Sequence, residues 1–411
     1  KKMSINLSRS PFYYKLQPST TTTPITRGVT QVFIWDGDIT AQPTMPTYTL
    51  NKTVIGDDQF IVIEVSKLVN DFISIVYSGN YSSTDIQNYY LSTSTIFFDS
   101  TNTQVGTSID TGAVLFSDGY SYFNQGANQT IGIGYGSDNE EICVPLNEQI
   151  YVPLYNGEAG NAVQVKFFTG TEAEAIAGQQ QLGQTQELLN DTESDQNMAY
   201  FSPNPNGGLV RNNLNEQEYN NLVNSITGAQ TTEIDDNNYP FCPDYNFIIT
   251  YIKVITNRNG NIFKKLIKVN TKRKDKFDPI KIVFVNRFGM YEDLWCFGNN
   301  QKSFAVTTDQ FKRNLLDRST ISYNADAHQY KTFSDQGKEK IRISTGYLPE
   351  QTNVVIKQLM LSQQIWIVQN GVIEPVNLAN KNIVFKTHLT EKLIDYQFEF
   401  EYAYDTINKV V

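Results

Sequence analysis

The stretch FIITYIKVITNRNGNIFKKLIKV, residues 247–269, contains the strongest local structural signal in the chain. Two runs rich in β-branched residues, 247–255 and 262–269, flank a short polar segment that contains Gly260. β-branched and aromatic side chains favour strands, and a Gly-containing loop of a few residues between two such runs is typical of a β-hairpin. The sequence therefore predicts a pair of antiparallel strands here.

Strand patterns continue towards the C-terminus. Residues 281–285 form a short apolar run, and residues 394–404 alternate apolar or aromatic side chains at even positions with polar ones at odd positions. Such alternation is typical of a strand with one buried and one solvated face. Residues 351–362 have apolar side chains at helical spacing and are followed by a strand-like run at 364–368. We therefore predict a second β-rich (α+β) domain over residues 241–411, with one or two short helices.

The N-terminal side also consists of short strand-like runs. Residues 29–35, 60–65, 72–77 and 95–98 are rich in Ile, Val and Phe, and Gly, Asn and Asp clusters separate them. Several short strands divided by turn signals indicate a sandwich. The predicted fold class is mainly β, with a β-sandwich over residues 1–168.

Between these parts, residues 169–240 are polar and turn-rich. Their low apolar content predicts an insertion or linker arm, within which residues 171–177 and 215–222 are candidate short helices. The total of 411 residues suits two or three domains, each large enough to bury a core.

Charge divides the chain into an acidic and a basic half. Residues 1–240 contain 9 Lys and Arg against 26 Asp and Glu, whereas residues 241–411 contain 24 against 17. Such asymmetry is typical of surfaces that attract an oppositely charged neighbour, although two domains with ordinary differences in surface charge would look the same. The basic run after residue 263 is the candidate interface, and its residues are Lys264, Lys265, Lys268, Lys272, Arg273 and Lys274. Because this run alternates with apolar residues at strand spacing, a solvated hairpin face or a face that meets an acidic neighbour is favoured, and a nucleic-acid partner is not expected.

The sequence offers little chemistry for catalysis. Two histidines and three cysteines occur without metal-ligand or disulfide spacing, and no known catalytic or nucleotide-binding motif is present. We therefore expect no enzyme activity, no cofactor, no metal site, and free, mostly buried thiols. The sequence contains no run of 18 apolar residues, so we expect no membrane span. The basic first residues are not followed by the apolar region that a secretory signal requires, so we expect no such signal in the sequence as given.

Exposed aromatic residues suggest an alternative function. Trp35, Tyr120 and Tyr122 are the candidates, because exposed aromatic rings stack on sugars, whereas most aromatic side chains at this density belong to a core. The alternative prediction is therefore a carbohydrate-binding module or adhesin that contacts a host-surface glycan, and a glycan depolymerase ranks third.

Four stretches together resemble a family of virion proteins of tailed bacteriophages and prophages with Bacteroidota hosts. They are SRSPFYY (8–14), VNRFGMYEDLWCF (285–297), STGYL through KQLMLS (344–362) and LIDYQFEFEYA (393–403). The resemblance covers both predicted domains and leaves out the polar segment around 170–240. It implies a structural subunit of the tail, baseplate or connector, present in the virion in symmetric copies, and it brings no active site with it. The expected partners are copies of the chain in a ring and other phage tail or connector proteins.

Overall fold

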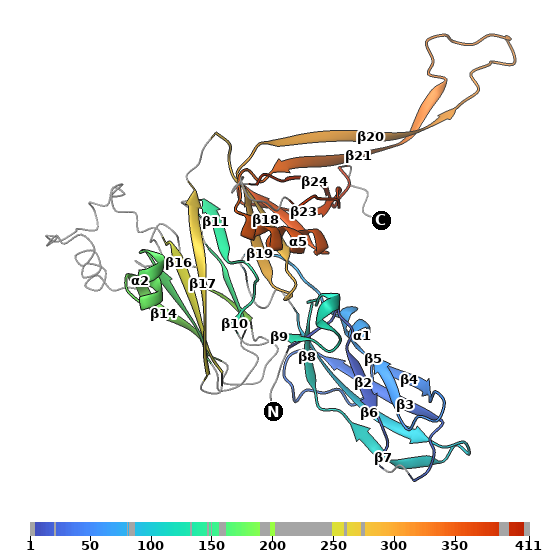
Figure 1. The fold of residues 1–411 in the computed structure, drawn as a ribbon. Helices are drawn as coiled ribbons and strands as arrows, with labels where there is room; N and C mark the ends of the chain where they lie inside the picture. The colour runs from blue at the N-terminus through green and yellow to red at the C-terminus, as the bar shows by residue number, and fades with distance from the viewer. Residues whose placement is uncertain are drawn as a thin grey trace, which may run out of the picture. The chain divides into compact units, whose positions relative to one another are not determined.

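The computed structural model describes residues 5–19, 22–79, 81, 87–131, 134–145, 148, 150–155, 162–189, 198–201, 249–258, 261–272, 276–385 and 394–406. These residues are mainly β, as predicted (Figure 1). They belong to two compact units that exchange chain segments. The first unit comprises Lys1–Lys274, Phe284–Leu294 and Gln351–Ser362, and the second comprises Asp275–Val283, Trp295–Glu350 and Gln363–Val411.

The N-terminal part of the first unit is a β-sandwich built from residues 5–131, a shorter range than the predicted 1–168. Its larger sheet has the strand order β4-β3-β6-β8-β1-β9, with β7 paired to β6, and its smaller sheet pairs β2 with β5. The strands are β1 (Ile5–Leu7), β2 (Tyr13–Leu16), β3 (Arg27–Trp35), β4 (Tyr48–Thr53), β5 (Ile61–Glu64), β6 (Tyr89–Phe98), β7 (Gln104–Asp110), β8 (Val114–Ser117) and β9 (Thr130–Ile131). A short helix, α1 (Ser66–Asn70), follows β5, and a 3-10 turn at Phe123–Gln125 precedes β9.

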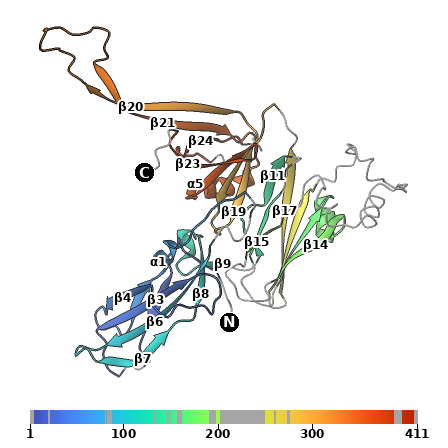
Figure 2. The same ribbon diagram turned by 180° about the vertical axis from the view of Figure 1, so that it is seen from behind.

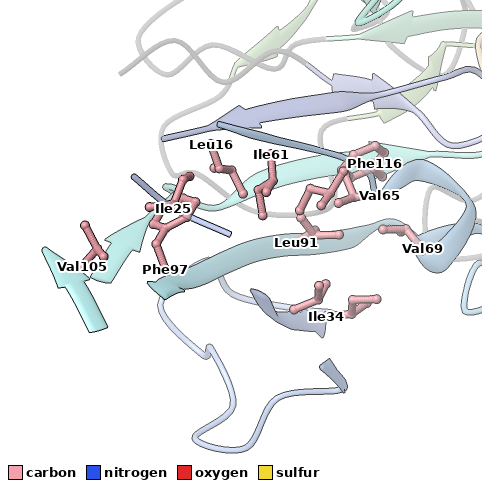
Figure 3. Packing of buried hydrophobic residues seen from close by; sticks show 12 residues of the cluster. Leu16, Ile25, Ile34, Ile61, Val65, Val69, Leu91, Phe97, Val105 and Phe116 are labelled. Carbon is pink, nitrogen blue, oxygen red and sulfur yellow. The ribbon is translucent and has the colours of Figure 1, made fainter. Parts of the chain in front are cut away.

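A single apolar cluster joins the two sheets of this sandwich. Leu16 and Ile61 from the smaller sheet pack with Leu91, Phe97 and other buried residues of the larger one (Figure 3). Alternate residues of β5 are buried, as a strand with one face on a core requires. The burial of these side chains stabilises the pairing of β2 and β5, because an isolated two-stranded sheet is marginal in water.

The predicted hairpin of residues 247–269 belongs to the first unit. It forms β16 (Tyr251–Arg258) and β17 (Asn261–Lys272) in a sheet of order β11-β17-β16-β13-β14, and a second small sheet has the order β10-β12-β15. The remaining strands are β10 (Gly134–Tyr135), β11 (Glu141–Pro145), β12 (Val152–Tyr155), β13 (Ala162–Phe168), β14 (Gln181–Leu189) and β15 (Met198–Phe201).

The predicted helix of residues 171–177 is α2 (Glu172–Ala177). The Thr171 hydroxyl and the Glu174 carboxylate form a reciprocal capping box at its start. Such a box satisfies two of the backbone amides that a helix leaves without partners.

The second unit is built on a seven-stranded sheet of order β19-β18-β22-β23-β24-β21-β20. Its strands are β18 (Ile280–Val285), β19 (Tyr291–Cys296), β20 (Asn300–Lys312), β21 (Tyr330–Ser344), β22 (Ile365–Gln369), β23 (Val372–Leu378) and β24 (Gln397–Tyr402), and β18 and β19 continue into the first unit. The predicted helix of residues 351–362 is α5 (Asn353–Leu361), preceded by a 3-10 turn at Glu350–Thr352.

A long two-stranded ribbon extends from this sheet. β24 pairs with β21 only over residues 340–344, whereas β20 and β21 remain paired with each other out to Lys312 and Tyr330. In both views the ribbon runs past the ends of β23 and β24 (Figures 1 and 2). Nine residues of β20, from Phe304 to Lys312, lie beyond the paired part of the sheet, which corresponds to about 30 Å at the usual rise of a strand. We call residues 304–339 the arm.

The structure differs from the sequence predictions in three places. Residues 72–77 form no strand and contribute only one isolated bridge position at Ile75. The units do not follow the predicted boundaries at 168 and 240, because β13 pairs along its whole length with β16 across the polar segment. The arm was not predicted. The candidate helix at 215–222 lies outside the described residues.

Candidate interaction surfaces

The predicted basic surface lies on β17 beside acidic residues of the same chain. β11 runs parallel to β17 and places Glu141 opposite Lys268. The Lys268 ammonium lies 2.9 Å from a Glu141 carboxylate oxygen, and Lys265 lies 3.9 Å from Glu140. The hydrogen bond to Glu141 raises the pKa of Lys268. Two of the predicted interface lysines therefore already have acidic partners within the chain.

The other members of the basic run are less fully described. Lys264 is exposed on β17. Lys272 ends the strand, although its side chain is not described, and Arg273 and Lys274 lie outside the described residues. In the described part of this strand, the ion pairs of Glu140 and Glu141 involve Lys265 and Lys268 and leave Lys264 as the predicted residue that contacts neither carboxylate.

Trp35 does not present its ring to solvent. It ends β3 with only 6% of its surface exposed, and its ring stacks on Tyr90 at a centroid distance of 5.6 Å. Its indole N–H donates a hydrogen bond of 2.9 Å to the Asp38 carbonyl oxygen. Sugar stacking requires an accessible ring face, so the predicted glycan contact fails at Trp35.

Tyr120 and Tyr122 lie together, edge to face, at a centroid distance of 5.9 Å. Cations of the same chain approach both rings: the Arg9 guanidinium lies 4.8 Å from the Tyr120 centroid, and the Lys357 ammonium lies 4.1 Å from that of Tyr122. Burial raises the pKa of both phenols. These contacts make the pair part of a cation–aromatic cluster within the first unit, and both rings are only partly exposed.

The same region is organised by a bidentate ion pair that sequence reasoning missed. Arg287 donates from Nη2 to an Asp138 carboxylate oxygen over 2.8 Å and from Nε to the other oxygen. Gln358 of α5 donates to that second oxygen over 2.9 Å and accepts from the Arg287 backbone N–H over 3.1 Å. A planar guanidinium held in this way fixes geometry as well as charge.

Three of the four stretches that carry the family resemblance meet here. Arg9, from the first stretch, lies 3.1 Å from Asp118 and donates to the carbonyl of Leu361, in the third stretch, over 3.5 Å. Arg287 belongs to the second stretch, and its carbonyl accepts a 2.8 Å bond from the Tyr120 backbone. The residues of the resemblance therefore connect separate chain segments, and a role in holding the unit together explains their chemistry. No local spacing in the sequence signals these contacts, because Asp118 and Asp138 lie far from their partners.

A buried carboxylate lies beside this ion pair. Glu292 of β19 accepts hydrogen bonds from the Ser137 hydroxyl over 2.8 Å and from the Asn286 side-chain amide over 3.0 Å. Burial raises the pKa of Glu292 to about 7, with smaller increases from Asp138 and Asp293, while the two hydrogen bonds act in the opposite direction. The group therefore changes charge near neutral pH.

The arm exposes more large apolar side chains than any surface predicted from the sequence. Every residue of β20 is exposed. The exposed large apolar side chains of the arm are Phe304, Val306, Phe311, Leu316, Ile321, Tyr323, Tyr330 and Phe333. The alternation of Phe304, Val306 and Thr308 with small and polar residues is a strand signal that was available in the sequence, but it does not say whether a strand is covered by other parts of the chain.

Among the described residues, no group of three or more His, Cys, Asp or Glu side chains is placed to hold a metal ion. Cys143 and Cys296 are buried, and Cys242 lies outside the described residues. None of the helices in the described part of the chain is long and apolar enough to span a membrane.

Comparisons with known proteins yield little similarity. No family model matches the chain, and no curated protein matches it. One solved structure, from work on the host cell surface retention of a 1.5-MDa bacterial ice-binding adhesin, aligns with 82% of this chain and 85% of its own at 9% identity and a TM-score of 0.16. A TM-score this low does not establish a shared fold, so nothing about this chain follows from the likeness.

Proposed function

We propose that this chain is a structural subunit that assembles in several copies, and that it does so in the tail, baseplate or connector of a tailed-phage virion. The arm is the observation that supports assembly. It is a two-stranded ribbon with β20 exposed along its whole length and eight large apolar side chains in contact with solvent.

In the described part of the chain, an exposed ribbon of this kind lacks a packed face and partner strands for its outer edges. Two strands without a packed face are marginally stable in water, and their outer edges present unpaired backbone groups. Proteins that work as monomers shorten, charge or cover such edges. A neighbour that covers the arm after assembly would bury its exposed apolar side chains and offer partners to its edges.

The phage assignment is supported by the sequence resemblance and by the role of its residues. Arg9, Arg287 and Gln358 connect distant segments of the first unit. Residues that build a scaffold suit a structural protein. The glycan-binding alternative has weaker support, because Trp35 is buried and cations of the same chain lie over Tyr120 and Tyr122.

The test is whether the chain is present in virions. Particles purified by density gradient from a host that carries the gene are analysed by quantitative mass spectrometry and by immunogold electron microscopy with an antibody to this chain. We expect several copies per particle and label confined to the tail region. A chain that is absent from purified particles, or that is found only in the cell envelope, contradicts the proposal.

A further inference from the structure

We propose that the arm of one copy docks into a groove on the N-terminal sandwich of a second copy, whose apolar lining is Tyr13, Ile55, Phe60, Ile61 and Val62 and whose polar lining is Lys52, Thr53, Asp58 and Glu64. This inference rests on the proposed function, because it names the contact through which copies assemble. The groove has a volume of about 380 Å³ and lies beside the small sheet of β2 and β5.

The arm exposes enough apolar surface to hold two proteins together. The exposed fractions of its eight large apolar side chains add up to about five whole side chains, which at about 200 Å² each amounts to roughly 1,000 Å². A standard stable interface buries about 800 Å² on each partner. The arm alone therefore supplies the area that one side of a specific contact needs.

The tip of the arm holds a strained residue in an exposed position. Ile321 has φ of +51° with 83% of its surface exposed. A β-branched side chain is strained in the left-handed region, and Asn or Gly would largely avoid this strain. Backbone strain of this kind is retained where the function needs a particular side chain. We take the exposed apolar side chain of Ile321 to be part of the surface that contacts a partner.

The groove is the matching feature on the sandwich. Tyr13 and Glu64 are directly opposite on the outer face of the β2–β5 pair, whereas their neighbours in sequence, Tyr14 and Ile63, face inward. Tyr13, Ile55 and Val62 are exposed and apolar, and the Lys15 ammonium lies 4.0 Å from the Phe60 ring centroid. β4 borders this region and pairs only with β3 among the described strands, so its outer edge has backbone groups for a further strand.

The charges favour a protein partner over a nucleic acid or an anionic membrane. The arm contains five basic and five acidic residues over 304–339. A phosphate-rich partner requires an excess of Lys and Arg, which the arm lacks. The groove also carries both signs of charge, with Lys52, Asp58 and Glu64 in its lining. Two surfaces on different parts of one chain, each with apolar side chains and charges of both signs, form a heterologous contact, which repeats from copy to copy and closes a ring where the rotation permits.

The first experiment measures association. The wild-type chain and three variants are compared by analytical ultracentrifugation and light scattering over a range of concentrations. Ile321→Asn removes the apolar tip and suits the left-handed backbone, and Ile55→Asp places a charge in the groove at an exposed turn position. Val384→Asp is the matched control, since Val384 is equally exposed and lies on neither surface.

We expect Ile321→Asn and Ile55→Asp each to weaken self-association about tenfold or more, and Val384→Asp to change it by less than about twofold. Thermal unfolding of dilute protein verifies that each variant is folded. A wild-type chain that remains monomeric at all concentrations overturns the inference, as does equal association of all four proteins.

The second experiment identifies the two surfaces. A chain with Phe333→Cys is mixed with a differently tagged chain with Ile55→Cys, both carrying Cys242→Ser, and a short bismaleimide is added. We expect a cross-linked heterodimer from this mixture and none when Val384→Cys replaces Ile55→Cys. A cross-link that forms only within a single chain carrying both Phe333→Cys and Ile55→Cys overturns the inference, because the arm then covers its own groove.

Failure of this inference and failure of the proposed function are distinguishable. If the chain is present in purified virions but gives no arm-to-groove cross-link there, the proposed function holds and the docking surface is wrong. If the chain is absent from virions but the cross-link forms, the docking surface holds and the virion assignment is wrong.

Discussion

Replacement of Glu292 by Gln tests the account of the buried carboxylate. In the folded chain, burial raises the pKa of Glu292 from its ordinary value of 4.5 to about 7. Because the pKa is raised on folding, the stabilising contribution of the protonated group is complete below about pH 4.5 and is lost as the pH rises through 7. A difference of this size corresponds to about 3 kcal/mol of free energy of unfolding.

Glutamine removes the titration and keeps the local contacts. The carbonyl oxygen of the glutamine accepts a hydrogen bond from the Asn286 amide. Its NH₂ group donates to the Ser137 hydroxyl oxygen and so replaces the O–H donor of the protonated glutamic acid. We therefore expect the stability of the variant relative to the wild type to increase by about 2.5 kcal/mol between pH 5 and pH 8, or roughly 5 °C in the melting temperature of the first unit.

The assay is thermal unfolding of wild type and Glu292→Gln between pH 5 and pH 8.5, with Glu172→Gln as a control for the loss of one negative charge from an exposed site. The difference in melting temperature is plotted against pH, so that any constant effect of the amide cancels. A difference that stays constant over this range would refute the reasoning, because it would mean that Glu292 does not titrate near neutral pH in the folded chain.

Three further outcomes follow from the same structure. Gly289→Ala should lower the free energy of unfolding by about 3 kcal/mol, because φ is +74° and the added Cβ would lie 2.9 Å from the Asp118 backbone. Gly371→Ala should lower it by only about 1 kcal/mol, because φ is similar at +76° but no atom lies within 4 Å of the added Cβ. Chemical denaturation of the two variants measures both values. Arg287→Ala should cost about 1–2 kcal/mol through loss of its paired bonds to Asp138, and Arg287→Lys should recover less than half of that loss in thermal unfolding, since an ammonium cannot form the bidentate contact. Lys268→Ala should cost less than about 1 kcal/mol, and the cost should shrink in 1 M salt, because its pair with Glu141 is partly exposed; a larger or salt-independent cost would indicate a contact other than the ion pair.

Local patterns predicted much of the secondary structure. The hairpin of β16 and β17, the helices α2 and α5, and the alternating strand β24 were all predicted, since each depends on propensity and periodicity within a few residues. Residues 72–77 have the same β-branched composition, yet they form no strand because no neighbouring segment pairs with them beyond one bridge at Ile75. Strand formation needs a partner, which composition does not report.

Long-range contacts explain what the sequence did not predict. The polar segment after 168 looked like a boundary, but the pairing of β13 with β16 joins the residues on either side of it. Arg287 and Asp138 are 149 positions apart, so no motif connects them. The arm was missed for the opposite reason: its strand pattern is ordinary, and only the structure reveals that no other described strand covers it.

The division of the chain into interleaved units has a consequence for its synthesis. The first unit needs residues up to Ser362, and the second needs residues on both sides of that point. A ribosome adds about 5–20 residues per second, so a domain that is continuous in sequence folds while later parts are still being made. Here α5 emerges only after β20, the arm and β21 have been translated. The first unit therefore cannot be completed until most of the polypeptide has left the ribosome, and a truncation at Lys274 removes the β18–β19 turn and α5 from it. The two units therefore complete their folding together, late in the synthesis of the chain.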